Sequence, residues 1–343
     1  MSWKIERKSP GVHRVTFSGS NYPEVNVMLS ADWHWDNPKA RWDLLERDLR
    51  TAKKIGALVC CFGDGLCLMQ GKYDKRSNKD SLRPEHASGS YLDKVVDTFV
   101  EFLAPYREVM GLISLGNHET AIQNRHETCV ITRVVERLRL LGSPCKAGGY
   151  NGWLQLTGVS DSGRSTHNYN LYYHHGSGGD SVKTMGLLGM DRINSFVAAD
   201  AIVSGHIHAR NLSNVARETL TPQGRRVVKE IALVRCSTYK DEYQPLAGFH
   251  VEKGRGPRPV ENPAYWLRLK MKRDKTGLNV SYADAPAEGL EEIENGTSRN
   301  DDNRRSSTNA KRSKPKAKVR STKARSRKSN SKRTASSARS KRR

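Results

Sequence analysis

Five short clusters of metal-ligating residue types occur along this chain, and each follows an apolar run. In order they are Asp32-Trp33-His34, Gly63-Asp64, Gly116-Asn117-His118-Glu119, His174-His175-Gly176 and Gly205-His206-Ile207-His208. An apolar run that ends at such a cluster is typical of a buried strand stopping at a loop, and the strand fixes the backbone of the residues after it. Together the five clusters predict one site, built at the ends of several strands.

Two pairs of these residues, Asp32 with His34 and His206 with His208, are two positions apart. In an extended backbone residues i and i+2 point to the same side, so each pair is able to reach one ion. The clusters offer two carboxylates, one amide and three or four imidazoles. Such mixed oxygen and nitrogen donors suit Mn, Fe, Zn or Ni and not a thiolate-only zinc site. Seven ligands are too many for one tetrahedral ion and fit two ions that share a bridging carboxylate.

Each cluster taken alone has an ordinary explanation. A single Asp-x-His or Gly-Asp is more often a turn, and a single His-His pair is more often a half-buried strand end. The series of five, each after its own apolar run, makes those explanations unlikely as a group.

The elements expected to position the clusters alternate between strands and helices. Residues 1–22 read as a leading strand or hairpin. Strands are predicted at 25–29, 57–62, 109–115, 153–157, 170–174, 201–204, 227–235, 247–252, 265–271 and 278–282, and helices at 38–55, 91–103, 120–141 and 182–198. A polar insertion, 65–90, directly follows Asp64 and is either a lid over the site or a solvated surface loop. Trp33, Trp35 and Trp42 either stack on a base or, more often for such aromatics, pack in the core or at its rim.

The net charge of +23 is concentrated at the end of the chain. Residues 303–343 hold 18 Lys and Arg with no Asp or Glu, which leaves +5 on residues 1–302. This segment has too little apolar surface to fold, so we expect a disordered tail that follows a linker over 287–302. A flexible cationic tail binds nucleic acid through counterion release, and a solubilising or acidic-protein-binding extension is the alternative. The expected nucleic-acid contacts include Arg304, Arg305, Lys311, Arg312, Lys314, Lys316 and Lys318.

Six cysteines without a Cys-x-x-Cys pair indicate reduced thiols and not a disulfide framework. The first residues lack the apolar core of a signal peptide, and no run reaches the length of a membrane span. We therefore expect a cytoplasmic or nucleoid-associated protein without a membrane partner. The sequence sets no oligomeric state.

In their order, the clusters resemble those of the calcineurin-like metallophosphoesterases, over roughly residues 25–210. The resemblance implies a domain over 1–286 with an α/β fold, a four-layer αββα sandwich of two mixed sheets flanked by helices. It also implies two divalent transition-metal ions, for which we expect Mn²⁺ with Fe, Zn or Ni as alternatives. One ion is held by Asp32, His34, Asp64 and His208, and the other by Asp64, Asn117, His206 and a histidine of the 174–175 pair. His175, directly before Gly176, is favoured, and His174 is the alternative.

The resemblance further implies hydrolysis of a phosphomonoester or phosphodiester. Two ions about 3.5–4 Å apart clamp the phosphoryl oxygens and activate a bridging hydroxide. His118 would protonate or stabilise the leaving oxygen, and Glu119 would either orient His118 or act as a helix-cap carboxylate. In the phosphoprotein-phosphatase branch a second Asp stands three residues after the first, where this chain has Cys67. That departure argues against a protein phosphatase of that branch.

Three functions stay open at this level. The first is a nuclease or phosphodiesterase tethered to nucleic acid by its tail. The second is a nucleic-acid-binding protein with a catalytically silent phosphoesterase-like body, although an intact ligand set favours an enzyme. The third is a phosphatase for small phosphoesters or phosphoproteins.

Overall fold

The computed structural model describes residues 3–69, 82–179, 184, 186–241, 243 and 261–286. The chain divides into two units, 1–295 and 296–343, and all described residues belong to the first. The predicted linker over 287–302, the tail from 303 to 343 and the strand predicted at 247–252 lie outside the described residues.

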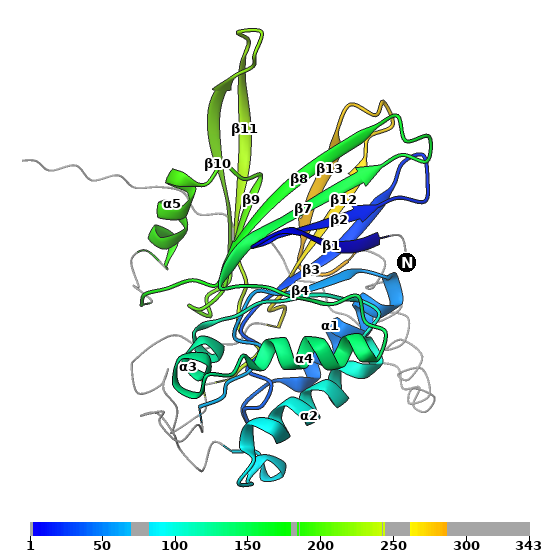
Figure 1. Ribbon diagram of the computed structural model, residues 1–343. Helices are drawn as coiled ribbons and strands as arrows, with labels where there is room; N and C mark the ends of the chain where they lie inside the picture. The colour runs from blue at the N-terminus through cyan, green and yellow to red at the C-terminus, as the bar shows by residue number, and fades with distance from the viewer. Residues whose placement is uncertain are drawn as a thin grey trace, which may run out of the picture. The chain divides into compact units, whose positions relative to one another are not determined.

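A six-stranded sheet carries the first three predicted clusters at the ends of its strands (Figure 1). Its order is β13-β12-β3-β4-β5-β6. β3 to β6 run parallel to one another, and β12 pairs antiparallel with both of its neighbours, β3 and β13. The strands are β3 (Glu24–Ser30), β4 (Leu58–Cys61), β5 (Met110–Ile113), β6 (Lys146–Ala147), β12 (Tyr265–Met271) and β13 (Leu278–Ala283). β4 and β5 are buried along their whole length, as expected for parallel strands covered on both faces.

A seven-stranded sheet carries the two histidine clusters. Its order is β1-β2-β7-β8-β9-β11-β10, with parallel pairs at β2–β7, β8–β9 and β9–β11. The strands are β1 (Trp3–Ser9), β2 (Val12–Phe17), β7 (Asn151–Val159), β8 (Thr166–His174), β9 (Ala201–Ser204), β10 (Asn211–Leu220) and β11 (Arg226–Arg235). β1 and β2 form the hairpin expected within residues 1–22.

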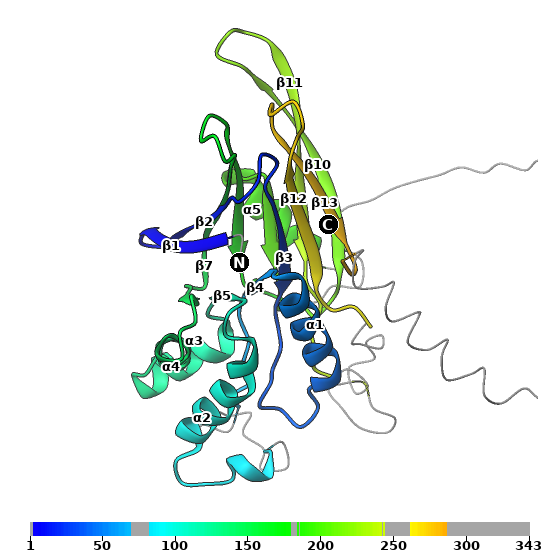
Figure 2. The ribbon, with the colours of Figure 1, turned by 90° about the vertical axis from the view of Figure 1, so that its right-hand side faces the viewer.

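The two sheets pack face to face, and helices cover both outer faces (Figures 1 and 2). Phe17 and Leu156 of the seven-stranded sheet share one buried cluster with Val27 and Leu267 of the six-stranded sheet. The helices are α1 (Trp42–Ile55), α2 (Tyr91–Leu103), α3 (Asn117–His126), α4 (Val130–Leu140) and α5 (Leu187–Phe196), with short 3₁₀ turns η2 (Pro84–His86) and η3 (Ala104–Tyr106). This arrangement confirms the predicted four-layer αββα fold.

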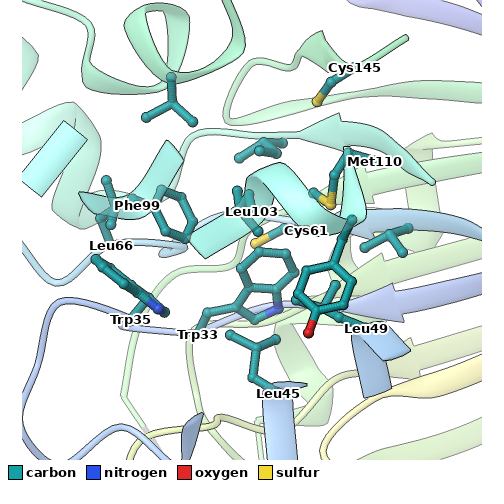
Figure 3. Close-up of a cluster of buried hydrophobic side chains, with 14 of the residues drawn as sticks. Trp33, Trp35, Leu45, Leu49, Cys61, Leu66, Phe99, Leu103, Met110 and Cys145 are labelled. Atoms are coloured by element: carbon teal, nitrogen blue, oxygen red, sulfur yellow. The ribbon is translucent and has the colours of Figure 1, made fainter. Parts of the chain in front are cut away.

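A second buried cluster joins α1, α2 and α4 to the outer face of the six-stranded sheet. Figure 3 shows Trp33 and Trp35 among Leu45, Leu49 and Phe99 in this cluster. Both tryptophans are buried, so they pack in the core, as their residue type favours, and do not present a surface for stacking a base. On the other outer face Met190 of α5 packs on Tyr172 and Ile202.

The helix predicted over 120–141 is wrong in one respect, because the structure has two helices there. α3 ends at Glu127, whose left-handed backbone (φ 53°) cannot continue a helix, and Cys129 is extended before α4 begins. The helix predicted from residue 38 begins at Trp42, because Asn37 and Pro38 form a turn in which the Asn37 Oδ1 accepts the amide of Lys39.

The strand β10 was not predicted at all. Its residues alternate only between partly buried and fully exposed, so neither face has the strong apolar pattern of a core strand. A full antiparallel ladder with β11 holds it in place.

The part of the insertion that the structure describes packs against the body. The Arg83 guanidinium lies 4.5 Å from the ring centre of Trp35 and 4.6 Å from that of Trp42. Such stacking of a cation on two indole rings fixes the end of the insertion to α1 and to the loop after β3. The six cysteines are free thiols, as predicted. Among the described residues no helix has the length and apolar content needed to cross a membrane.

Candidate metal centre

The ends of five strands bring the predicted ligands together. Asp32 and His34 follow β3, Asp64 follows β4 and Asn117 follows β5, and these three strands are parallel neighbours. In the seven-stranded sheet His175 follows β8, and His206 and His208 follow β9, which is the parallel neighbour of β8. Because parallel strands end at the same edge, the loops after them meet in one place.

The first group of donor atoms comes from Asp32, His34 and His208. The Nε2 atoms of His34 and His208 are 3.2 Å apart, and Asp32 Oδ1 lies 3.9 and 3.4 Å from them. Donors that share an ion at 2.0–2.2 Å are separated by about 3–4 Å, so these spacings fit one cation. Asp32 Oδ1 is buried and makes no hydrogen bond to the described residues, which is the condition of an atom that binds a cation.

The second group comes from Asp64, His175 and His206, with Asn117 beside them. His175 Nε2 lies 3.2 Å from Asp64 Oδ2 and 3.1 Å from Asn117 Oδ1, and His206 Nδ1 lies 2.7 Å from the same Asn117 oxygen. His175 Nδ1 is 2.9 Å from the carbonyl of Phe62. A carbonyl only accepts, so Nδ1 carries a proton there and Nε2 is the ring atom that faces the group.

His174 lies outside each of the three donor groups found among the described residues, of which the third is His34, Cys67 and His118. Its Nδ1 accepts the backbone amide of Gly176 at 3.0 Å, whereas His175 is fully buried beside Asp64. This placement favours His175 over His174 as the ligand.

In each of the two aspartates, one carboxylate oxygen accepts a backbone amide and the other faces the candidate ligands. Asp32 Oδ2 accepts the amide of His206 at 2.8 Å while Oδ1 faces the first group. Asp64 Oδ1 accepts the amide of His118 at 3.0 Å while Oδ2 faces His175. The amide bonds orient both carboxylates, so the remaining oxygen of each is fixed in place before any ion binds.

The i, i+2 pairs do not have the extended backbone that the sequence suggested. Asp32, His34, Asp64, His206 and His208 all have positive φ, between 44° and 70°. These are sparsely populated conformations for residues with a Cβ, and each costs about 1–3 kcal/mol. The loops are held in them by cross-strand bonds, such as those of the Asp32 and His34 amides to the carbonyls of Gly63 and Asp64, both 3.0 Å. Such strain concentrated on five candidate ligands supports a functional role for these loops.

Glu119 supports the loops and points at backbone groups. Its carboxylate accepts the amides of Gly116 at 2.8 Å, Asp64 at 3.1 Å and Leu66 at 3.0 Å. Burial and the nearby Asp64 raise the pKa of Glu119 to about 8. These bonds favour the helix-cap role for Glu119 and connect the loop after β4 to the start of α3.

A backbone carbonyl holds the Nδ1 atom of His118. Its Nδ1 is hydrogen-bonded to the carbonyl of Cys67, and its Nε2 lies 3.7 Å from Asp64 Oδ2. The residue that replaces the second Asp of the phosphoprotein-phosphatase branch thus still orients the histidine, through its main chain. The Cys67 sulfur also lies within 4.8 Å of ring nitrogens of His34 and His118, and burial raises the pKa of its thiol to about 12, so without a bound cation the thiol keeps its proton at neutral pH.

The electrostatics of the groups suit a cation. Burial, with His118 and Lys240 nearby, lowers the pKa of His34 well below its usual range and leaves a neutral imidazole. Burial acts to raise the pKa of Asp64, but His175 and His118 outweigh it and hold this pKa well below the usual value. Burial acts to lower the pKa of His175, but Asp64 raises it to about 10. Without an ion His175 therefore holds a proton on Nε2 at neutral pH, and a cation bound at this group would have to displace it, so metal binding should release a proton.

Sequence reasoning missed two supporting residues. Asp36 is buried and accepts the amides of Cys67 and Leu68 (2.9 Å for Leu68), and so fixes the loop that holds His118. Tyr150 donates its hydroxyl to the carbonyl of Gly176 at 2.6 Å, and so fixes the loop after His175. Asp36 lies two residues after His34, and this closeness to a candidate ligand could have marked it in the sequence. Only the fold shows which amides it binds.

Gly116→Ala should weaken metal binding without unfolding the protein. A Cβ at this position would overlap Oδ1 and the backbone nitrogen of Asp64, so the carboxylate would have to move. We expect a loss of about tenfold to a hundredfold in metal affinity, the usual effect of disturbing the groups that orient a ligand. Titration of metal-free protein with Mn²⁺ would measure it. Gly65→Ala is the matched control, because the nearest atom to its Cβ would be Cys61 Sγ at 3.6 Å; equal affinities of both variants and the unmodified protein would contradict this role of Gly116.

No model of a protein family matches the sequence, and no curated protein matches it. Among solved structures it is similar to a conserved uncharacterized protein (predicted phosphoesterase) from Streptococcus pneumoniae, with a TM-score of 0.26 over 76% of this chain and 88% of that one. It is also similar to a metallophosphoesterase from Sphaerobacter thermophilus (0.30; 80% and 95%) and to a Vps29 double mutant from Entamoeba histolytica (0.23; 54% and 87%).

Each of these structures has 12% sequence identity with this chain. Two of them are named as phosphoesterases, the class that the motifs resemble, but TM-scores of 0.23–0.30 are too low to support a function. The fold and the ligand geometry of the chain itself support the proposals below.

Proposed function

We propose that this protein is a metal-dependent phosphoric ester hydrolase with two divalent transition-metal ions, Mn²⁺ first and Fe, Zn or Ni as alternatives. The observation that carries the proposal is the pair of adjacent donor groups, Asp32-His34-His208 and Asp64-His175-His206, with buried carboxylate oxygens turned toward both. Bound there, two such ions would polarise the phosphoryl oxygens and lower the pKa of a water.

The chain's own residues supply the rest of the chemistry. Asp64 is bonded to the His118 amide by one oxygen and lies near His175 of the second group by the other, and His34 of the first group is among the charges that lower its pKa. We therefore assign Asp64 as the candidate bridging ligand. His118 turns Nε2 toward the same Asp64 oxygen while Nδ1 is held by the Cys67 carbonyl. We assign to His118 the donation of a proton from Nε2 to the leaving oxygen.

A direct assay separates this proposal from a catalytically silent body. Metal-free protein reloaded with Mn²⁺ should hydrolyse bis-p-nitrophenyl phosphate, p-nitrophenyl phosphate or both, and elemental analysis should find two ions per chain. Chelation should remove the activity, and added Mn²⁺ should restore it. Two bound ions with no hydrolysis of either ester, or of DNA, would favour the silent-body alternative, and less than one ion per chain would contradict the metal centre itself.

We further propose that the tail, with 18 Lys and Arg over residues 303–343, tethers the enzyme to nucleic acid. Polyphosphate binding through released counterions is strongly salt-dependent and independent of base sequence. Among the cations that would act this way are Arg304, Arg305, Lys311, Arg312, Lys314, Lys316 and Lys318.

Removal of residues 303–343 should weaken binding to DNA or RNA by orders of magnitude at low salt, and the remaining chain, at a net +5, should show a much shallower salt slope. Hydrolysis of a small chromogenic diester should stay nearly unchanged, because every candidate metal ligand precedes residue 210. Filter binding or fluorescence anisotropy at several salt concentrations measures the first effect. Equal affinities and slopes for both chains would show that the tail is not the nucleic-acid element.

A further inference from the structure

A pocket of about 400 Å³ lies between α5 and the two loops that carry metal-ligand candidates from the seven-stranded sheet. Gly176 and Ser177, directly after His175, line it from one loop, and Ser204 and Ile207, on either side of His206, line it from the other. Figures 1 and 2 show α5 beside this sheet. Residues that line the pocket are therefore direct chain neighbours of the candidate metal ligands His175 and His206.

The lining combines an apolar wall with guanidinium groups. Phe196 and Leu188 of α5 are 70% and 65% exposed, an unusual exposure for two large apolar side chains at one pocket. Arg192 and Arg235 also line it, and Arg235 is 1% exposed with its Nη2 bonded to the carbonyl of Gly186. No carboxylate is among the described residues that line the pocket.

The apolar wall and the guanidinium groups together indicate which chemical group would fit this pocket. A volume of 400 Å³ falls within the range of small-molecule sites, about 300–1,000 Å³. An exposed phenyl ring offers a face on which a flat ring stacks, and the positive charge suits a ligand attached to a phosphate. A larger open hollow of about 910 Å³, lined by Tyr22, Lys270 and Lys272, includes none of the candidate ligands and lacks this connection to the centre.

We propose that this pocket binds the nucleoside half of a phosphodiester whose phosphorus lies at the metal centre, with the base against Phe196 and the retained phosphate side toward Arg192. The inference rests on the proposed function, since it names the substrate class of that site. It makes Phe196 a specificity-determining residue: the ring contributes to binding the retained half and takes no part in the bond that breaks.

Three esters with the same leaving group test it: the p-nitrophenyl esters of thymidine 5′-monophosphate, phenyl phosphate and methyl phosphate. With Mn²⁺-loaded protein, Phe196→Ala should lower kcat/KM for the thymidine ester about tenfold or more, mainly through KM, and leave the methyl ester unchanged. Because Phe196 is mostly exposed, the variant should keep the Tm of the unmodified protein. Tyr22→Ala, which removes an exposed aromatic ring from the other hollow, is the matched control.

The outcomes separate the alternatives. An equal loss on the thymidine and phenyl esters would show a general aromatic site and overturn the nucleoside assignment, and an equal loss on all three esters would assign the pocket to the leaving group and overturn it too. An unchanged kcat/KM for all three esters would show that Phe196 does not recognise the substrate and would overturn the proposal.

If the unmodified protein hydrolyses none of the esters, the proposed function fails, but calorimetry of thymidine 5′-monophosphate binding to EDTA-treated protein still tests the pocket. Binding that Phe196→Ala weakens would support it, and equal or absent binding would overturn it.

Discussion

Asp64→Asn should abolish hydrolysis of bis-p-nitrophenyl phosphate, with kcat/KM falling by about a thousandfold or more, which corresponds to about 4 kcal/mol of transition-state stabilisation. We assign Asp64 to both donor groups, because its Oδ2 lies 3.2 Å from His175 Nε2 of the second group and because His34 of the first group is among the charges that lower its pKa. The amide that replaces it retains the size of the side chain and an acceptor for the His118 amide, so the fold should persist. The negative charge that attracts a cation is lost.

Metal content and thermal unfolding should be measured together in this variant. We expect the bound metal to fall from two ions per chain to one or fewer, with little change in the Tm of the metal-free protein. Asp48→Asn is the matched control, because Asp48 is also a buried aspartate but is bonded to Tyr239 and Arg47 and lies in neither donor group. An Asp64→Asn protein that binds two ions and keeps its turnover would rule out Asp64 as the bridging ligand.

The positions along the chain of the strands that carry the site could be predicted, because the same signal occurred five times. Each cluster followed an apolar run, and a run of four buried residues such as Leu58–Cys61 requires a strand covered on both faces. That the ligands meet in one site was inferred from the repetition of the clusters, and the structure gives the reason, because parallel strands end at one edge. The four-layer arrangement came from the resemblance, since apolar runs alone do not say how two sheets pack.

Backbone conformation at the site was beyond sequence reasoning. Asp32 and His34 were expected to reach one ion by the alternation of an extended chain, and they do so in the left-handed region, at φ 53° and 44°. Such conformations are stabilised by bonds to distant loops, here the carbonyls of Gly63 and Asp64, which the local sequence does not encode. The break between α3 and α4 at Glu127 is a similar case, because no Gly or Pro marks it.

The partner of His118 shows how a substitution in a motif is compensated. Cys67 in place of a carboxylate suggested that the histidine lacks its orienting group. In the fold the main-chain carbonyl of Cys67 takes that position, and Asp36 fixes the same loop by accepting the Cys67 and Leu68 amides. The role depends on backbone geometry, so residue type at position 67 does not decide it.

His118→Ala should then lower kcat strongly while metal content stays near two ions per chain. A positioned general acid contributes about 10²–10⁴ in rate, and the larger value applies where the leaving oxygen is a poor leaving group. We therefore expect a loss of about a thousandfold on an alkyl phosphodiester and of about tenfold or less on bis-p-nitrophenyl phosphate, whose leaving group needs no proton.

The slope of log kcat against the pKa of the leaving alcohol measures this directly, and it should become steeper in the variant. His167→Ala is the matched control, because His167 stands at the opposite end of β8 from His175 and is bonded to the carbonyl of Lys275. Loss of an ion from His118→Ala would identify His118 as a ligand and not an acid. An equal loss of rate on good and poor leaving groups would instead assign it to binding the phosphoryl oxygens, because only proton donation depends on the leaving group.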